Sequence, residues 1–271
     1  MDFTGERFIP ESVKDDFEIA VEHYQRYLSV VPLVKGKTVL DIACGEGYGS
    51  FILSEMAQQV VGVDIDEQSI TLAREKYVDH ASQKLSFLQG AMTDIPFPDN
   101  FFDVLVSFES LEHISGQEQE IFLSEIKRVL KDDGIAIIST PNTETYSATL
   151  KQANPFHERE LNEKEFTELL GSRFKCVAIY SQSFEICSLL VRMDGEVAGN
   201  LPVINWRKSV QLPLTPKYLI ALAYDQLKSD FSDISSIALD TGKSFDDIMT
   251  AYRAANEEIE KLANWGRALD A

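Results

Sequence analysis

An acidic residue followed by alternating glycines is the most informative pattern in this chain. Asp41 closes a short apolar run, and Gly45, Gly47 and Gly49 follow in the spacing Asp-x-x-x-Gly-x-Gly-x-Gly. Glycines at such a turn let the backbone approach a ligand closely, because a Cβ atom there would block it. The carboxylate of Asp41 can accept hydrogen bonds from a cationic or amine-bearing ligand. The pattern therefore favours a positively charged cofactor over a pyrophosphate.

A second acidic residue stands where a nucleoside site would need it. Asp64 ends the next apolar segment and lies 19 residues after Gly45. An acidic residue at about that distance past a glycine turn is typical of a ribose hydroxyl acceptor. A dinucleotide dehydrogenase is one alternative, but it expects Gly-x-Gly-x-x-Gly, and here the third glycine comes one residue earlier. A purely structural strand, turn and helix is the other alternative.

A cluster of possible metal ligands follows the fourth apolar segment. Glu109, Glu112 and His113 have the spacing Glu-x-x-Glu-His, which on a helix or turn places the side chains on one face. Two carboxylates buried together need a neutralising cation, and His157 offers a fourth ligand. Mixed imidazole and carboxylate donors suit Mn²⁺, Fe²⁺, Co²⁺ or Zn²⁺ better than Mg²⁺. The metal-free alternative is that His113 acts as a base or only positions the substrate.

The strand, glycine turn, helix and acidic strand end together resemble the class I S-adenosylmethionine-dependent methyltransferases. The resemblance implies an α/β fold, with a Rossmann-like, seven-stranded, mostly parallel sheet, helices on both faces and a helical C-terminal tail. It implies S-adenosyl-L-methionine as the cofactor. The cofactor contacts that it implies are Asp41, Ala43, Gly45, Gly47, Asp64, Ile65 against adenine, Met92, and Tyr24 and Arg26 toward the methionine carboxylate. Ala91 stands where such enzymes often have an acidic adenine ligand, so the Met92 backbone or Asp94 would replace it.

Further motifs narrow the resemblance. The Glu-x-x-Glu-His element is similar to that of metal-dependent small-RNA 2′-O-methyltransferases and of ubiquinone-biosynthesis methyltransferases, which implies Glu109, Glu112, His113 and His157 as metal ligands. The segments TGERFIPE, EHYQRY, STPN and NPFHEREL resemble bacterial methyltransferases linked to surface polysaccharides such as O-antigen. That resemblance implies a saccharide acceptor and a glycosyltransferase module as a possible partner.

Bulk composition limits the partners and the location. The chain has 271 residues, 44% of them hydrophobic and 25% charged, with a net charge of −19. This charge weighs against nucleic acid, which needs a basic surface. No run approaches the roughly 20 apolar residues of a membrane span, and the polar N-terminus lacks the features of a secretory signal. Three cysteines without paired spacing indicate a reducing, cytoplasmic location.

The remaining pattern predicts elements that alternate between strand and helix, as in βαβ units with a parallel sheet. Ligands of such sheets bind at the carboxyl ends of the strands. We expect strands at 38–42, 59–64, 85–89, 102–107, 135–140, 174–180 and 217–225. We expect helices at 17–31, 49–56, 67–79, 117–130 and 161–170.

This pattern divides the chain into three parts. Residues 1–36 form an N-terminal arm and helix, 37–225 the methyltransferase domain, and 226–271 a helical tail. Within the domain, 181–216 is an insertion near the active-site edge. The tail has apolar residues in a 3-4 spacing typical of a coiled coil, at Tyr252, Ala255, Ile259, Leu262, Gly266 and Leu269. We expect self-association through this helix or continuation beyond residue 271; a helix packed on the domain is the alternative.

Together these features predict an O-methyltransferase that acts on a sugar hydroxyl of a glycan intermediate. In this hypothesis His113 and Glu112 are the catalytic residues, and a divalent metal (Mn²⁺, Mg²⁺, Fe²⁺ or Zn²⁺) assists. One alternative is a metal-free O- or N-methyltransferase of a small metabolite. The other is a non-catalytic, methyltransferase-like scaffold in a glycan-assembly complex.

Overall fold

A computed structural model describes residues 17–77, 84–146, 154–184, 216–226 and 234 of the chain. The helices are α1 (Phe17–Val30), α2 (Tyr48–Ser54), α3 (Glu67–Tyr77), α4 (Gly116–Val129) and α6 (Glu163–Gly171), with short 3₁₀ turns η1 (Val31–Val34) and η3 (Leu111–His113). The strands are β1 (Thr38–Ile42), β2 (Gln59–Asp64), β3 (Leu85–Gln89), β4 (Phe102–Ser107), β5 (Leu130–Pro141), β6 (Cys176–Gln182) and β7 (Tyr218–Tyr224).

The strands form one sheet in the order β3-β2-β1-β4-β5-β7-β6, with β7 antiparallel to both of its neighbours and the other pairs parallel. The chain starts at β1 in the middle, runs outward to β3 and then returns to β4 on the other side of β1. This reversal places the carboxyl ends of β1 and β4 side by side, and ligands of open α/β sheets bind at such a switch point.

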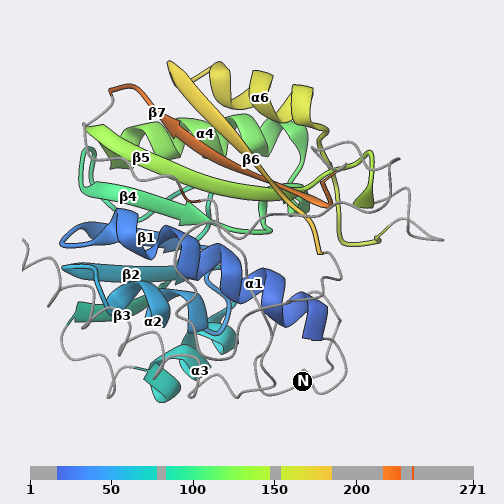
Figure 1. Cartoon of the computed structure of the whole chain (residues 1–271). Coiled ribbons are helices and arrows are strands. Elements are labelled where there is room, and N and C mark those ends of the chain that lie inside the picture. The colour runs from blue at the N-terminus through green and yellow to red at the C-terminus, as the bar shows by residue number, and fades with distance from the viewer. Residues whose placement is uncertain (1–16, 78–83, 147–153, 185–215, 227–233, 235–271) are drawn as a thin grey trace, which may run out of the picture.

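Helices cover both faces of the sheet (Figure 1). Neighbouring side chains along a strand pack against helices on opposite faces. In β1, Val39 packs with the cluster under α1, α2 and α3, whereas its neighbour Leu40 packs with the cluster under α4 and α6. Successive side chains of a strand point to opposite faces, so a strand covered on both sides must be apolar throughout. The expected mostly parallel sheet with helices on both faces is therefore confirmed.

The predicted elements match the structure closely. The first four strands have the predicted bounds, and the other predicted elements shift by one or two residues at one or both ends, except β5. β5 begins at Leu130 rather than at residue 135, because Leu130 pairs with Phe102 before a register shift leads to the Ile135–Val104 pair. Residues 131–134, between Leu130 and Ile135, are polar or glycine, so the search for apolar runs did not detect this part of the strand.

Several expectations concern residues that the structure does not describe. The N-terminal arm to residue 16, most of the predicted 181–216 insertion and the helical tail after residue 226, apart from Ile234, lie outside the described residues. Within the part of the chain that is described, no helix is both long and apolar enough to cross a membrane.

Candidate active site

The glycine turn after β1 combines a left-handed backbone with an open side. Ala43, Gly45 and Gly47 have φ values of 61°, 54° and 82°, a region that residues with a Cβ atom rarely adopt. A Cβ atom on Gly45 would meet nothing within 4 Å, whereas one on Gly47 would lie 2.6 Å from the Phe87 ring. On Gly49 it would lie 2.0 Å from the Tyr27 ring. Gly45 therefore faces open space, and the other two glycines leave room for aromatic rings. That a ligand lies against Gly45 stays a prediction.

Asp41 is enclosed by the fold rather than open to solvent. Its carboxylate accepts hydrogen bonds from Ser50 Oγ at 2.6 Å and from Tyr27 Oη at 3.2 Å, and the residue is fully buried. Burial raises the pKa of Asp41 to about 7, the charge of Asp64 adds to the increase, and the two hydrogen bonds offset part of it. The carboxylate thus joins α1 and α2 to the end of β1. Its direct contact with a ligand stays a prediction.

Asp64 and Ile65 lie at the end of β2, next to the glycine turn. Asp64 Oδ2 accepts a hydrogen bond from the Gly45 N–H at 2.8 Å, and Oδ1 accepts one from the Asp66 N–H at 2.9 Å. These two bonds orient the carboxylate beside the turn. Ile65 is 69% exposed, the highest value among the exposed large apolar side chains of the described residues. An exposed apolar side chain beside a fixed carboxylate is the arrangement expected for adenine and ribose.

A turn and a helix carry two further predicted cofactor contacts. Met92 is partly buried against the core, and it lies in a turn closed by a bridge between Ala91 and Asp94. On α1, Tyr24 is half-buried and packs edge-on against Tyr48, with 5.8 Å between the ring centroids. The adenine and methionine contacts predicted for Met92 and Tyr24 stay predictions.

Arg26 lies on α1 and is buried. Its Nη1 donates to Gln182 Oε1 at 2.8 Å and lies 3.6 Å from Glu109 Oε1, and its guanidinium lies 4.7 Å from the centroid of the Tyr218 ring. Among the described residues, its Nε and Nη2 have no hydrogen-bond partner. Buried N–H groups without partners are costly, so this cation is prepared for an anionic group. Its predicted pairing with the methionine carboxylate stays a prediction.

The structure corrects one step of the metal-site argument. Glu109 has a φ of 51° and precedes the 3₁₀ turn η3, so the helical spacing assumed for Glu109 and Glu112 does not apply. The Glu109 carboxylate instead accepts a hydrogen bond from Ser139 Oγ at 2.6 Å and lies near Arg26. Glu109 is therefore not part of the ligand group that the structure brings together.

Glu112, His113 and His157 form that group. One ligand atom from each lies within 4.8 Å of the others. Glu112 is 1% exposed and His157 6%, whereas His113 is 32% exposed and so borders solvent. Two imidazoles and one carboxylate are a donor set that binds divalent transition metals.

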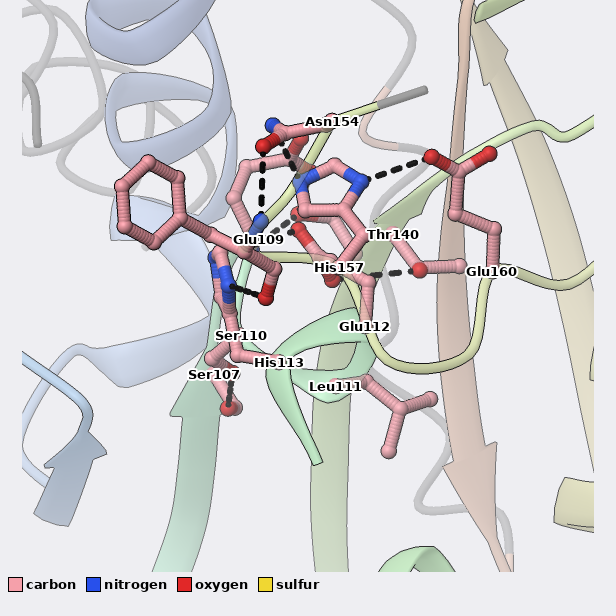
Figure 2. Close-up of polar contacts among 12 residues, drawn as sticks. Ser107, Glu109, Ser110, Leu111, Glu112, His113, Thr140, Asn154, His157 and Glu160 are labelled. Atoms are coloured by element: carbon pink, nitrogen blue, oxygen red, sulfur yellow. Dashed lines mark hydrogen bonds and ion pairs between the residues drawn. The ribbon is translucent and has the colours of Figure 1, made fainter. Parts of the chain in front are cut away.

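Hydrogen bonds orient both imidazoles, as Figure 2 shows for His157 between Asn154 and Glu160. His157 Nδ1 lies 2.7 Å from Glu160 Oε1, and His157 Nε2 lies 3.0 Å from Asn154 Nδ2. His113 Nδ1 lies 3.0 Å from the carbonyl oxygen of Phe156. A carbonyl or carboxylate oxygen only accepts, so each Nδ1 donates and each Nε2 carries the lone pair. His113 Nε2 lies 4.0 Å from Glu112 Oε1, whereas His157 Nε2 accepts a hydrogen bond from Asn154 Nδ2, which a metal would have to displace. Histidines that bind metals are oriented in this way.

The surroundings of the Glu112 carboxyl disfavour its ionised form. Burial raises the pKa of Glu112 well above its ordinary value, and the nearby charge of Glu109 raises it further. Thr140 Oγ1 donates a hydrogen bond to Glu112 Oε2 at 3.2 Å, which offsets part of the increase. A bound cation would therefore have to displace a proton here.

Sequence analysis did not identify the residues that hold Asp41 and His157 in place. Tyr27 and Ser50 hold Asp41, while Asn154 and Glu160 hold His157. The last two could have been found, because both lie three residues from His157 in NPFHEREL. The first two come from helices whose relation to Asp41 only the fold establishes.

The fold and this site define a class of protein. The strand order, the antiparallel β7, the open glycine turn and the acidic end of β2 agree with class I methyltransferases, and residues 40–138 match the family model described as "Methyltransferase domain". The chain therefore contains a class I, Rossmann-like, S-adenosylmethionine-dependent methyltransferase domain.

Individual relatives add detail. A probable S-adenosylmethionine-dependent methyltransferase of Mycolicibacterium smegmatis is 38% identical over 168 residues, which are 62% of this chain and 62% of that protein. A ubiquinone biosynthesis O-methyltransferase of Azorhizobium caulinodans is 29% identical over 133 residues, 49% of this chain and 51% of that one. The crystal structure of the PH0226 protein of Pyrococcus horikoshii OT3 has the same fold, with a TM-score of 0.56 and 22% identity over 81% of this chain and 100% of that chain. This chain spans less than two thirds of the first curated relatives that it matches.

Proposed function

We propose that this protein transfers a methyl group from S-adenosylmethionine to a hydroxyl group of a sugar, in a glycan or polysaccharide intermediate, with help from a divalent metal. The domain match and the names of the curated relatives support methyl transfer and the cofactor. The observation that supports the metal and the hydroxyl acceptor is the group formed by Glu112, His113 and His157.

The residues around the glycine turn fit the cofactor. Gly45 leaves open space beside the backbone, Asp64 presents a fixed carboxylate, and Ile65 presents an exposed apolar surface for adenine. Arg26 Nε and Nη2, which have no hydrogen-bond partner among the described residues, suit the methionine carboxylate. When bound, S-adenosylmethionine supplies an activated methyl group on a positively charged sulfur. The turn has to hold that methyl group in line with the acceptor oxygen, because positioning contributes much of the rate of such transfers.

The three-residue group also fits a divalent metal. Glu112, His113 and His157 would hold it, and Mn²⁺, Fe²⁺ and Zn²⁺ match the two nitrogens and one oxygen better than Mg²⁺ does. When bound, such a cation binds neighbouring hydroxyls and lowers the pKa of one of them. With the metal bound, the Nε2 lone pair of His113 would be used for coordination, so Glu112, the other predicted catalytic residue, would take the hydroxyl proton directly or through water. Without the metal, His113 Nε2 is the candidate base.

Three other features support a sugar acceptor and a role in glycan assembly. A pair of neighbouring hydroxyls, common in saccharides, suits a metal held on one side by protein ligands. The net charge of −19 disfavours a nucleic acid acceptor. The four segments that resemble polysaccharide-linked methyltransferases support a cytoplasmic role in surface-glycan assembly. A glycosyltransferase module as partner, and self-association through the predicted coiled coil at 226–271, belong to the same proposal.

A second candidate function is metal-free O-methylation of a small metabolite. The bond between His113 Nδ1 and the Phe156 carbonyl favours it, because the same tautomer makes Nε2 a general base without a cation. One relative is named a ubiquinone biosynthesis O-methyltransferase, which supports a small hydroxyl acceptor.

Calorimetric titration of Mn²⁺ into protein saturated with S-adenosylhomocysteine tests these functions. Metal-assisted transfer predicts stoichiometric binding that is lost in His157→Ala and Glu112→Gln. It predicts that Glu158→Gln, an exposed neighbour of His157, binds as the unaltered protein does. No Mn²⁺ binding would favour the metal-free enzyme. No binding of S-adenosylhomocysteine would favour a non-catalytic scaffold.

A further inference from the structure

The metal-binding group is assembled from two segments far apart in the sequence. Glu112 and His113 belong to η3, whereas His157 belongs to the loop that precedes α6. The backbone joins the two segments, because the carbonyl oxygen of Glu112 accepts hydrogen bonds from the N–H groups of Glu158 at 2.8 Å and Arg159 at 3.1 Å. The geometry of the group thus depends on how η3 and this loop are held together.

A single buried amide on a third element binds both segments. Gln119 lies in α4 and is fully buried. Its Nε2 donates to the carbonyl oxygen of Leu111 at 2.9 Å and to that of Arg159 at 3.1 Å. Its Oε1 accepts from Arg159 Nη1 at 3.0 Å. Both N–H donors of the amide and its oxygen are therefore used, and they reach the residue before Glu112 and the residue two after His157.

The helix that bears Gln119 is itself well fixed. Its first turn is closed by a capping box between Ser115 and Glu118, which satisfies two of the free N–H groups at a helix start. A Cβ atom on Gly116 would lie 2.9 Å from Arg159 Nη1, so this glycine leaves room for the arginine beside the helix. Farther along, Phe122, Leu123 and Ile126 anchor the helix in the core. Gln119 thus projects from a rigid support.

We propose that Gln119 is a positioning residue that sets the distance between the His113 and His157 imidazoles and so the affinity of the group for a metal. The consequence for catalysis rests on the proposed function; the effect on the two imidazoles does not. The side chain must be an amide. A carboxylate would repel the two carbonyl oxygens, and an apolar side chain would leave both of them without a donor.

The first test observes the imidazoles directly and needs no metal. The chain has four histidines, so ¹⁵N-histidine NMR spectra can be assigned by single substitutions. Gln119→Glu and Gln119→Leu should move the ring signals of His113 and His157 and leave those of His23 in place. Gln117→Glu is the matched control, since it makes the same change at an exposed position of the same helix and should move none of them.

The second test measures metal affinity by Mn²⁺ titration of protein saturated with S-adenosylhomocysteine. Loss of a residue that orients metal ligands typically lowers affinity about 10- to 100-fold, and we expect that loss for both Gln119 variants with little change in S-adenosylhomocysteine affinity. Arg159→Met removes one of the three bonds from an exposed side chain and should weaken Mn²⁺ binding in the same direction. The Arg159→Met variant replaces the Gln119 variants in both tests if those do not fold.

The outcomes separate this inference from the proposed function. Unchanged His113 and His157 signals in a folded Gln119 or Arg159 variant would overturn the inference. So would Mn²⁺ affinity equal to that of the unaltered protein. Displaced imidazole signals in a protein that binds no Mn²⁺ at all would support the positioning role and reject the metal-assisted function.

Discussion

Replacement of Asp41 by asparagine should change how the stability of this protein depends on pH. The Asp41 carboxyl is fully buried, and its pKa rises from the ordinary 3.8 to about 7. Asparagine has the same shape. Its oxygen can accept from one of the two hydroxyls of Ser50 and Tyr27, and its amide nitrogen can donate to the other. The substitution therefore removes the ionisation while leaving the packing in place.

The raised pKa of Asp41 determines whether stability rises or falls with pH. A carboxyl with a higher pKa in the folded state binds its proton more tightly there, so protonation stabilises the fold. This contribution is complete below the unfolded-state value of 3.8 and is lost as the pH rises through about 7. At about 1.36 kcal/mol per pKa unit, the whole contribution is about 4 kcal/mol, of which about 3 kcal/mol is lost between pH 5 and pH 8.

Urea unfolding at about pH 5, 6.5 and 8 measures this contribution, because urea is uncharged and extrapolates linearly to water. The free energy of unfolding of the unaltered protein should fall relative to that of Asp41→Asn as the pH rises. Asp103→Asn is the control. Hydrogen bonds from Lys131 and the Thr38 N–H lower the pKa of Asp103 despite its partial burial, so that residue stays ionised over the whole range. A difference between the unaltered protein and Asp41→Asn that is equal at all three pH values would refute the reasoning.

Three further predictions test the site. Gly49→Ala places a Cβ atom 2.0 Å from the buried Tyr27 ring, so it should lower the free energy of unfolding by about 1–3 kcal/mol or more; an unchanged urea midpoint would contradict this. Gly45→Ala meets no neighbour within 4 Å but has a φ of +54°, so it should cost only about 1–2 kcal/mol while weakening S-adenosylhomocysteine binding in a calorimetric titration. If that binding is unchanged, the ligand does not lie against Gly45. Mn²⁺ affinity should increase about tenfold per pH unit while Glu112 remains protonated, and a titration series with no slope would mean that no proton is displaced.

Much of the fold follows from local sequence patterns. The strands β1 to β4 were predicted with their observed bounds, because each is a short apolar run that ends at a polar residue or a turn. The position of Asp64 beside the glycine turn was also predictable, since parallel strands end at the same edge of the sheet. The hydrogen bond from the Gly45 N–H to Asp64 agrees with that argument.

The group of Glu112, His113 and His157 shows where local patterns fail. The spacing of Glu109 and Glu112 predicted that both face the same way, but a positive φ at Glu109 turns its side chain toward Ser139 and Arg26. Such a backbone angle in a residue other than glycine is set by its surroundings. Arg26 likewise pairs with residues from β6 and from the turn after β4, a relation that no spacing within α1 reveals.

The sequence by itself therefore determined the class of the domain, the order of its elements and the edge of the sheet at which ligands bind. These properties depend on hydrophobic periodicity and on glycines, which act over a few residues. Only the tertiary structure decided which carboxylate joins the two histidines, that Asp41 is enclosed by Tyr27 and Ser50, and that Gln119 bonds to both segments that carry Glu112, His113 and His157. These contacts join segments that are distant in the chain, and their geometry arises only when helices and loops pack around the finished sheet.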